Sequence, residues 1–327
     1  MQPSFERGTK SENANSGLSK ANAALLGVVY STVLASLPMD LFQDRSNYLD
    51  YAEASLEILA GYAIGGPLSV LFNEPLWLLM NAGLSSFLSP DLVVRTFVFC
   101  SAYVAAYYIL RSRPKSWYFL LLFLLVPQVM KKFTTHIRQG VAISVFICGW
   151  FSKSKSLKFS LLSVTPLIHS SFFFVLFIYY LTSLLNSINF SSSLQATAHT
   201  IFGLFVVPSS LLVASLVGAR QANRYQLGLE DVSGFGFIFW LTIAVLFLMQ
   251  NSSYIKSNMF SLGGLIFYLS GYFLSGFVVR AFESFIPILL VSGLDMSSSK
   301  RKVFIFLILL YSSMQWSLEL IGVFSSF

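Results

Sequence analysis

Long apolar runs separated by short polar segments recur along the chain from about residue 21 onward. Many of them approach the roughly 20 residues that a helix needs to cross a hydrocarbon core about 30 Å thick. The pattern therefore predicts an all-α, polytopic membrane bundle of about eleven transmembrane helices. The predicted spans lie near residues 22–39, 91–110, 116–130, 139–152, 157–170, 171–187, 197–217, 235–250, 260–279, 281–294 and 303–322.

Two segments depart from this pattern. Residues 1–20 are polar and too mixed in charge for a signal peptide, so we expect a disordered cytoplasmic tail before a single transmembrane domain over 21–327. Residues 74–89 are apolar but short, and we expect a re-entrant or interfacial segment there. The main segments on the far side of the membrane are then 40–90 and 218–234.

Composition supports the membrane assignment. The chain has 55% hydrophobic and 11% charged residues, with a mean hydropathy of +0.71, whereas soluble domains carry about 25% charge. Cys100 and Cys148 both lie inside apolar runs, which favours neither a disulfide nor a thiolate metal site. The sequence also lacks phosphate-loop, zinc-protease and serine-hydrolase motifs. We expect no metal, no cofactor and no nucleic-acid partner, and the bilayer as the surroundings.

Charge is distributed unevenly between the two sides. With the N-terminus in the cytoplasm, most lysines and arginines fall on the cytoplasmic side, as the positive-inside rule prefers. Cations on the disfavoured side indicate a polyanionic ligand, and arginine suits phosphate or diphosphate especially well. Carboxylates on the same side either pair with these cations or serve in acid–base chemistry. The far-side cations are Arg45, Arg95, Lys131, Lys132, Arg138, Arg220, Arg224 and Arg280.

The densest polar group between two apolar runs lies within residues 131–140. It comprises Lys131, Lys132, Thr135, His136, Arg138 and Gln139. Ionisable groups at the start of a buried helix are costly and are by default functional. If the segment is one helix, Arg138 and Gln139 lie one turn beyond Thr135 and two beyond Lys131, on a ligand-facing stripe. The alternative is that they cap neighbouring helix ends.

His169 and Glu74 are candidates for the general base. His169 lies three residues after Pro166 in an apolar run, so its ring either accepts a proton or satisfies a carbonyl freed by the proline. Glu74 precedes Pro75, and its carboxylate either acts chemically or stabilises a helix N-terminus. We expect His199 to be a helix-end residue facing lipid headgroups on the opposite side, so the three histidines do not form one metal centre.

Further candidates surround this group on the far side. Tyr48 and Tyr51 share a helical spacing with Asp44 and either stack on sugar rings or form part of the interfacial aromatic belt. Arg220 and Arg224 lie in a late loop, where they either contact ligand or face solvent. Arg280 interrupts an apolar run, and it either pairs with Glu283 or faces a diphosphate.

Four segments, taken in order, resemble one family. The chain resembles the EpsG/Wzy family of bacterial polysaccharide polymerases over about residues 20–190. Asn47 stands where that family usually has Asp, and Leu76 where it often has Gly. The matching segments are N-Y-L-D-Y at 47–51 (family D-Y-x-x-Y), E-P-L-W-L-L-M-N at 74–81 (E-P-G-F-x-L-L-N), T-H-I-R-Q-G-V-A at 135–142 (N-x-x-R-Q-x-x-A) and L-I-H-S-S at 167–171 (L-I-H-x-S).

The resemblance implies a glycosyltransferase that joins oligosaccharide repeat units carried on undecaprenyl diphosphate. It would build O-antigen, capsule or exopolysaccharide at the periplasmic face of the bacterial inner membrane, and a chain-length regulator is a possible partner. Protein cations would stabilise the departing diphosphate in place of a metal. The catalytic candidates are His169, Glu74 and Arg138. The substrate-binding candidates are Gln139, Lys131, Lys132, His136, Tyr48, Tyr51, Arg220, Arg224 and Arg280.

Two other classes of function stay open from the residues. A flippase or transporter of lipid-linked oligosaccharide would also place cations in a membrane cavity, although transporters often contain internal repeats and we find no convincing one. A glycan ligase or an O-acyltransferase would also use a far-side histidine and arginine.

Overall fold

The structure, a computed structural model, describes residues 17–42, 44–216 and 234–325. Within these ranges every regular element is a helix, as the apolar pattern predicts. Residues 1–16 of the tail and the two loop arginines, Arg220 and Arg224, lie outside the described residues. The start of the ordered chain is attached to the bundle, because the buried Leu18 donates its backbone N–H to the carbonyl of Pro114 at 3.0 Å.

Among the residues described up to 187, the chain forms ten α-helices and two short 3-10 helices. These are α1 (Lys20–Ser36), α2 (Arg45–Ile64), α3 (Pro67–Phe72), α4 (Pro75–Ser85), α5 (Pro90–Ser112), η1 (Pro114–Ser116), α6 (Trp117–Leu124), α7 (Pro127–Thr134), α8 (Ile137–Phe151), α9 (Lys155–Val164), η2 (Thr165–Leu167) and α10 (Phe172–Ser187).

The second half continues with helices only, among the residues described. These are α11 (Ser192–Leu216), α12 (Phe235–Leu248), α13 (Ser252–Ser257), α14 (Met259–Gly271), α15 (Phe277–Glu283), α16 (Ile286–Gly293) and α17 (Ser298–Ser325).

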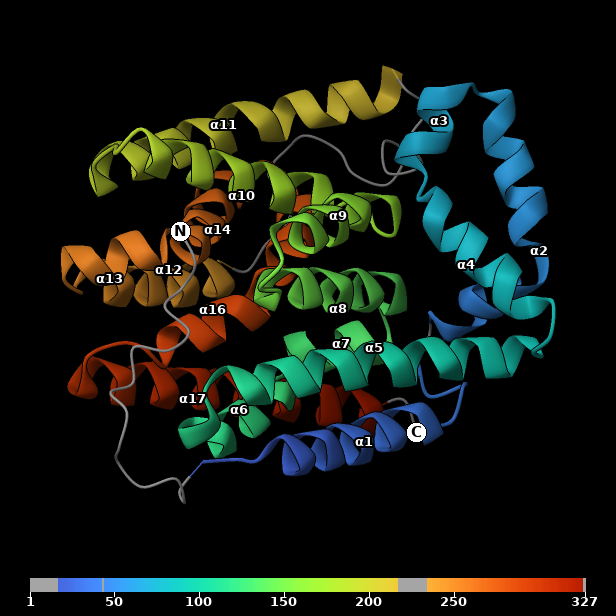
Figure 1. Cartoon of the computed structure of the whole chain (residues 1–327), viewed down its shortest axis with the longest axis horizontal. Coiled ribbons are helices and arrows are strands. Elements are labelled where there is room, and N and C mark those ends of the chain that lie inside the picture. The colour runs from blue at the N-terminus through green and yellow to red at the C-terminus, as the bar shows by residue number, and fades with distance from the viewer. Residues whose placement is uncertain (1–16, 43, 217–233, 326–327) are drawn as a thin grey trace.

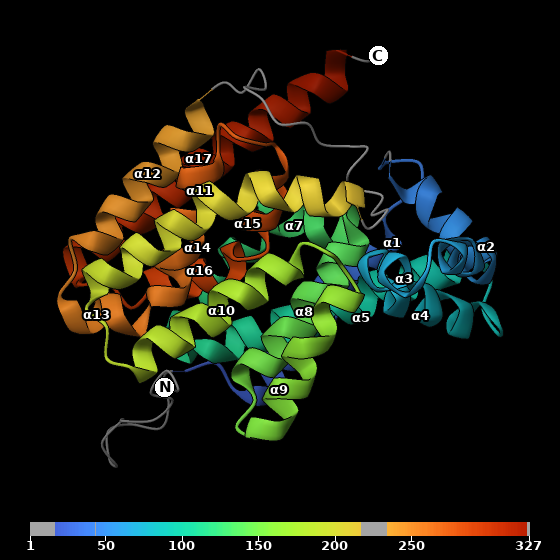
Figure 2. The ribbon, with the colours of Figure 1, turned by 90° about the horizontal axis from the view of Figure 1, so that it is seen from above.

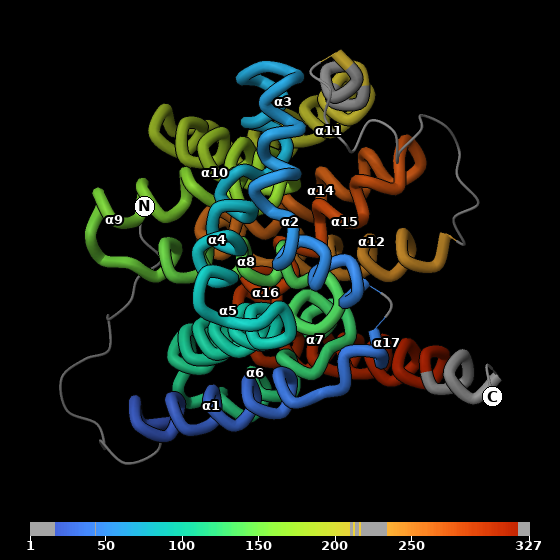
Figure 3. The backbone as a smooth tube through the Cα atoms, turned by 90° about the vertical axis from the view of Figure 1, so that its right-hand side faces the viewer, coloured from blue at the N-terminus to red at the C-terminus, as the bar shows by residue number. Residues whose placement is uncertain are grey.

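The long helices lie roughly side by side, and α2, α3 and α4 form an arm at one end of them (Figure 1). Seen from above, α11 to α17 gather on one side and the arm projects from the other (Figure 2). The view onto the arm shows α2, α3 and α4 in front of the bundle (Figure 3). The arm corresponds to residues 40–90, which the sequence predicts as the main segment on the far side.

Prolines mark many of the helix starts. Pro67, Pro75, Pro90 and Pro127 stand in the first turns of α3, α4, α5 and α7, where a missing N–H costs no hydrogen bond. Pro127 follows a sharp break, because the segment up to Leu124 and α7 are bent by 70°. The span predicted near 116–130 is therefore a broken pair of helices.

A second break separates α7 from α8. His136 has non-helical angles, φ −100° and ψ 58°, so α7 ends at Thr134 and α8 begins at Ile137. The two helices cross closely at Gly140, where a Cβ would lie only 2.2 Å from the carbonyl oxygen of Lys132. The single stripe expected along residues 131–139 is wrong, because Lys131 and Lys132 belong to one helix and Arg138 and Gln139 to another.

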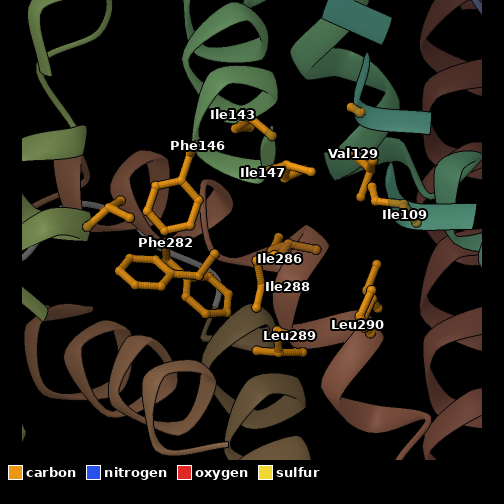
Figure 4. Packing of buried hydrophobic residues seen from close by; sticks show 14 of the residues in the cluster. Ile109, Val129, Ile143, Phe146, Ile147, Phe282, Ile286, Ile288, Leu289 and Leu290 are labelled. Atoms are coloured by element: carbon orange, nitrogen blue, oxygen red, sulfur yellow. The ribbon is translucent and has the colours of Figure 1, made fainter. Parts of the chain in front are cut away.

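The hydrophobic core is centred on α16. Every residue of this helix from Ile286 to Gly293 is buried, which identifies it as an interior helix rather than an amphipathic surface helix. Figure 4 shows Ile286 and Ile288 below the side chains of α8, with Ile109 of α5 and Val129 of α7 to one side. Helix α16 therefore packs against α5, α7, α14 and α17.

Few of the described helices could cross a membrane by themselves. Only α5, among the residues described, is long and apolar enough, and the bent pair of residues 114–124 and α7 would add a second span. Helices α8, α10, α12 and α14 are apolar but shorter; the longest, α10, has 16 residues and rises about 24 Å, less than a core of about 30 Å. The predicted number of about eleven spans is not confirmed.

Candidate functional site

Glu74 is the N-cap of α4 and has left-handed backbone angles, φ 62° and ψ 53°. A non-glycine residue in this region costs about 1–3 kcal/mol and commonly marks a functional position. The residue is 2% exposed. Its Oε2 accepts a hydrogen bond from Nη1 of Arg138 at 2.5 Å, and its Oε1 accepts from the backbone N–H and the hydroxyl of Ser170 at 3.1 and 3.2 Å. One buried carboxylate thus joins α4, α8 and the segment before α10.

Arg138 lies between this carboxylate and two tyrosines. Its Nη1 is 3.4 Å from the hydroxyl of Tyr51, and its guanidinium carbon lies 5.1 Å from the ring centroid of Tyr51 and 6.0 Å from that of Tyr48. These distances suit cation–π attraction. We call the group Tyr48, Tyr51, Glu74, Arg138 and Ser170 the Glu74 site.

One donor of Arg138 is unused. Its Nε is buried and has no hydrogen-bond partner. Leaving a buried polar group without a hydrogen bond costs about 1–3 kcal/mol of stability, and more if the group is charged. Each such group in a native protein therefore needs an explanation. A phosphate oxygen that displaces the groups covering Nε would satisfy it.

A second polar chain runs beside the Glu74 site, through Gln139. Its Nε2 donates to the hydroxyl of Ser284 at 2.8 Å and to the carbonyl of Arg280 at 2.7 Å, and its Oε1 accepts from Nζ of Lys132 at 3.1 Å. Lys132, 1% exposed, also pairs with the carboxylate of Glu283. Gln139 therefore ties α8 to α7 and α15.

His169 closes this chain at its other end. Its Nδ1 is 2.8 Å from the hydroxyl of Ser171, which lies 3.4 Å from that of Ser284. The backbone N–H of Ser171 also donates to Nδ1 at 3.3 Å. That bond requires a lone pair on Nδ1, so in the neutral ring the proton sits on Nε2. In this geometry Nδ1 of His169 accepts a hydrogen bond, and Nε2 carries the proton.

The carbonyl freed by Pro166 is satisfied by another residue. The oxygen of Leu162 accepts from both the hydroxyl of Thr165, at 2.7 Å, and its backbone N–H. The carbonyl of Leu162 therefore does not need a hydrogen bond from the ring of His169.

Most of the other far-side cations that the structure describes are already paired. Lys131 lies 2.7 Å from Glu319 and Arg95 2.7 Å from Asp91. The fully buried Arg45 donates to several backbone carbonyls: those of Leu34, Leu37, Pro38 and Thr134. Arg280 is exposed. Because these cations are paired, the excess of positive charge indicates a polyanionic ligand less strongly than the sequence suggests. The unpartnered Nε of Arg138 is more specific evidence for such a ligand.

His136 lies at the α7–α8 break, 3.3 Å from the carboxylate of Asp44. Burial lowers the pKa of its imidazole, and the positive charges of Lys132 and Arg280 lower it further. The ring is therefore neutral near pH 7, and its contact with Asp44 is a polar contact rather than an ion pair.

His199 is not a helix-end residue facing headgroups, contrary to expectation. It lies within α11 and is fully buried against α10 and α14, with Nε2 2.9 Å from the hydroxyl of Thr182 and Nδ1 2.6 Å from the carbonyl of Gln195. Gly263 on α14 makes room for the ring. His199 is a packed structural residue of the bundle.

The sequence-predicted residues converge only in part. Tyr48, Tyr51, Glu74 and Arg138 meet at the Glu74 site, and Gln139, Lys132 and His169 belong to the adjoining polar chain. Serines 170, 171 and 284 were missed by sequence reasoning. A serine in an apolar segment does not stand out in the sequence, because serine is common inside apolar helices. Ser284 could have been noticed because it follows Glu283, the only carboxylate in its apolar segment.

The comparisons with known proteins extend these observations. A family model described as the EpsG family matches residues 28–323, nearly the whole chain and well beyond the 20–190 region of the motifs. No curated protein and no solved structure matches the chain.

Proposed function

The chain belongs to the EpsG family, and from that premise we propose that it is a polysaccharide polymerase of the bacterial inner membrane. Its family and its apolar helices indicate a membrane protein of polysaccharide biosynthesis. We propose that both substrates are oligosaccharide repeat units carried on undecaprenyl diphosphate, joined at the periplasmic face with the N-terminus in the cytoplasm. A chain-length regulator would be a separate partner.

The proposed reaction is a glycosyl transfer. A hydroxyl oxygen of the acceptor saccharide forms a bond to the anomeric carbon of the donor, and the bond from that carbon to the diphosphate breaks. The diphosphate leaves with the electron pair, and a base takes the hydroxyl proton. Catalysis requires positive charge or hydrogen-bond donors at the leaving diphosphate and an acceptor for the proton.

Arg138 is the proposed partner of the leaving diphosphate. It holds Glu74 through Nη1 while its buried Nε has no acceptor, so the guanidinium can bridge the carboxylate and a phosphate oxygen. The neutral ring of His169 would add a second donor through Nε2. Together they would stabilise the charge that develops on the leaving oxygen.

Glu74 is the proposed base. Bonds from Arg138 and Ser170 hold its carboxylate in place, and a carboxylate oriented in this way can accept the proton of the acceptor hydroxyl. Tyr48 and Tyr51 would present ring faces to the sugar, which places the saccharide beside the carboxylate.

One observation carries this proposal: four family motifs, separate in the sequence, meet at one buried carboxylate. Tyr51, Glu74, Arg138 and Ser170 come from the four segments at 47–51, 74–81, 135–142 and 167–171 and are linked by hydrogen bonds. An ion pair that served only to stabilise the fold would involve residues from two of these segments, not from all four.

The test replaces Arg138 in cells that depend on this protein for their polymer. Arg138→Ala should abolish polymer and leave single repeat units, with a loss of roughly 10²–10³ or more in rate. Arg138→Lys should recover little, because a point charge does not reproduce the planar fork. The matched control is Arg95→Ala, another far-side arginine in a local ion pair, which should keep the polymer. Normal polymer in both Arg138 variants would overturn the assignment.

A further inference from the structure

A separate cleft of about 310 Å³ opens on the other side of the α7–α8 crossing. It lies between α7, α12, α14, α15, the start of α16 and α17. Its size falls at the lower end of the range for small-molecule sites, about 300–1,000 Å³. We call it the Glu283 cleft. Its lining includes Gln128, Lys131, Trp240, Glu283, Gln315 and Glu319.

Aromatic rings and amides dominate the lining. Trp240 packs edge to face on Phe282 at 4.9 Å and lies 6.1 Å from Tyr311, and Tyr268 is 4.4 Å from Phe282. Indole and phenol combine an apolar face with a polar edge. Gln128 and Gln315 add groups that both donate and accept hydrogen bonds. This combination suits a polyhydroxylated ring with an apolar face, which is a sugar.

The charges of the cleft disfavour a phosphate ligand. Glu283 and Glu319 both line it, and Lys131 is neutralised by Glu319 at 2.7 Å. Lys132 behind Glu283 is likewise paired. A diphosphate would meet two carboxylates here, whereas sugar hydroxyls can donate to them. The ligand class is therefore a saccharide without its diphosphate.

The side chain of Gln128 hydrogen-bonds to Tyr311, but its amide oxygen has no donor. Oε1 of Gln128 is buried and has no hydrogen-bond partner. A buried amide oxygen normally accepts a hydrogen bond. A ligand hydroxyl that donates to this oxygen would therefore gain more binding free energy than one placed elsewhere in the cleft.

We propose that the Glu283 cleft binds sugars of the oligosaccharide substrate that lie beyond the reacting hydroxyl, an inference that rests on the proposed function. Each repeat unit is an oligosaccharide, and only its reacting sugar has to lie beside Glu74 and Arg138. The cleft and the Glu74 site are joined by consecutive residues of α8, because Arg138 binds Glu74 while Gln139 binds Lys132, the partner of Glu283. Sugars in the cleft would therefore belong to the same oligosaccharide as the reacting sugar at the Glu74 site.

The test measures binding to the full chain purified in detergent. The first probe is the free oligosaccharide released by mild acid from the host's lipid-linked repeat units, and the second is undecaprenyl diphosphate without sugar. Gln128→Met keeps the volume of the side chain and removes the amide, so it should weaken binding of the oligosaccharide roughly tenfold. It should leave binding of undecaprenyl diphosphate unchanged, whereas Arg138→Ala should do the reverse.

Gln195→Met is the matched control. Gln195 also has a buried, unpartnered Oε1, but it lies on α11 outside the cleft, so the substitution should change neither affinity. Trp240→Leu provides a second variant and should weaken the oligosaccharide alone. Wild-type affinity for the oligosaccharide in both cleft variants, or no binding of it by the wild type, would overturn the cleft assignment. Neither result changes the outcome expected for polymer formation by the Arg138 variants. The cleft assignment and the proposed function can therefore be refuted independently.

Discussion

The Glu74 site and the Glu283 cleft lie on the two sides of the α7–α8 crossing, and each contains a cation paired with a carboxylate. At the Glu74 site both partners are enclosed, with side-chain exposures of 14% for Arg138 and 2% for Glu74. At the cleft Lys132 is equally enclosed, at 2%, but Glu283 is 20% exposed and borders open space. The two pairs have the same formal charge and different surroundings.

The enclosed pair is better suited to chemistry on a charged group than the pair that borders open space. Low dielectric surroundings strengthen every interaction at the enclosed pair, and a left-handed backbone at Glu74 holds the carboxylate there. At the cleft, Lys132 is a buried support that orients Gln139 and Glu283, while Glu283 presents an oxygen to the ligand. We therefore assign the diphosphate to the first region and the uncharged saccharide to the second.

The largest expected effect separates the two candidate bases of the Glu74 site. Glu74→Gln removes the proton acceptor, so turnover should fall by roughly 10²–10⁴. His169→Gln keeps a donor close to the position of Nε2 and should retain most activity, whereas His169→Ala should lose more. Polymer formed by purified protein from undecaprenyl-diphosphate repeat units is the readout.

The opposite pattern would break the comparison at this point. If His169→Gln lost activity as severely as Glu74→Gln while still binding undecaprenyl diphosphate, His169 would be the base. Its ring would then have to adopt the other tautomer, and the bond from the backbone of Ser171 would have to be absent in the active state.

A smaller effect is expected at the cleft pair, and mainly on stability. Glu283→Gln leaves the buried Lys132 uncompensated and should cost about 3 kcal/mol of unfolding free energy. Lys132→Met should cost less, because water at the cleft can solvate Glu283. The double variant Lys132→Met/Glu283→Gln should recover most of the loss. Thermal unfolding in detergent measures all three.

Equal losses in the two single variants, with no recovery in the double variant, would contradict this ranking. The Lys132–Glu283 pair would then not be the coupled unit described here, and its carboxylate would not be water-accessible through the cleft.

Much of the Glu74 site could be predicted from the sequence. Ionisable residues are rare in apolar runs, so Glu74, Arg138 and His169 stand out, and the order of the four motifs relates them to one family. The helical spacing of Tyr48 and Tyr51 also holds, since both lie on α2 with ring centroids 6.4 Å apart.

The remaining features depend on breaks between helices and on contacts between residues far apart in the chain. The hydropathy pattern contains no information about either. The break at His136 separates Lys132 from Arg138, although the residues around it read as one polar stretch. The contact between Lys132 and Glu283 joins residues far apart in the chain. Runs that look long enough to cross a bilayer divide into shorter helices, so the number of spans could not be settled from periodicity.

The proposed reaction forms a glycosidic bond as a diphosphate departs from beside Arg138. It is measured most directly by counting the undecaprenyl diphosphate released and the glycosidic bonds formed by purified protein in liposomes, supplied only with lipid-linked repeat units. We expect one diphosphate lipid released for each bond formed, and neither product from Arg138→Ala. Repeat units that cross the bilayer without any new bond would contradict it and identify a transporter instead.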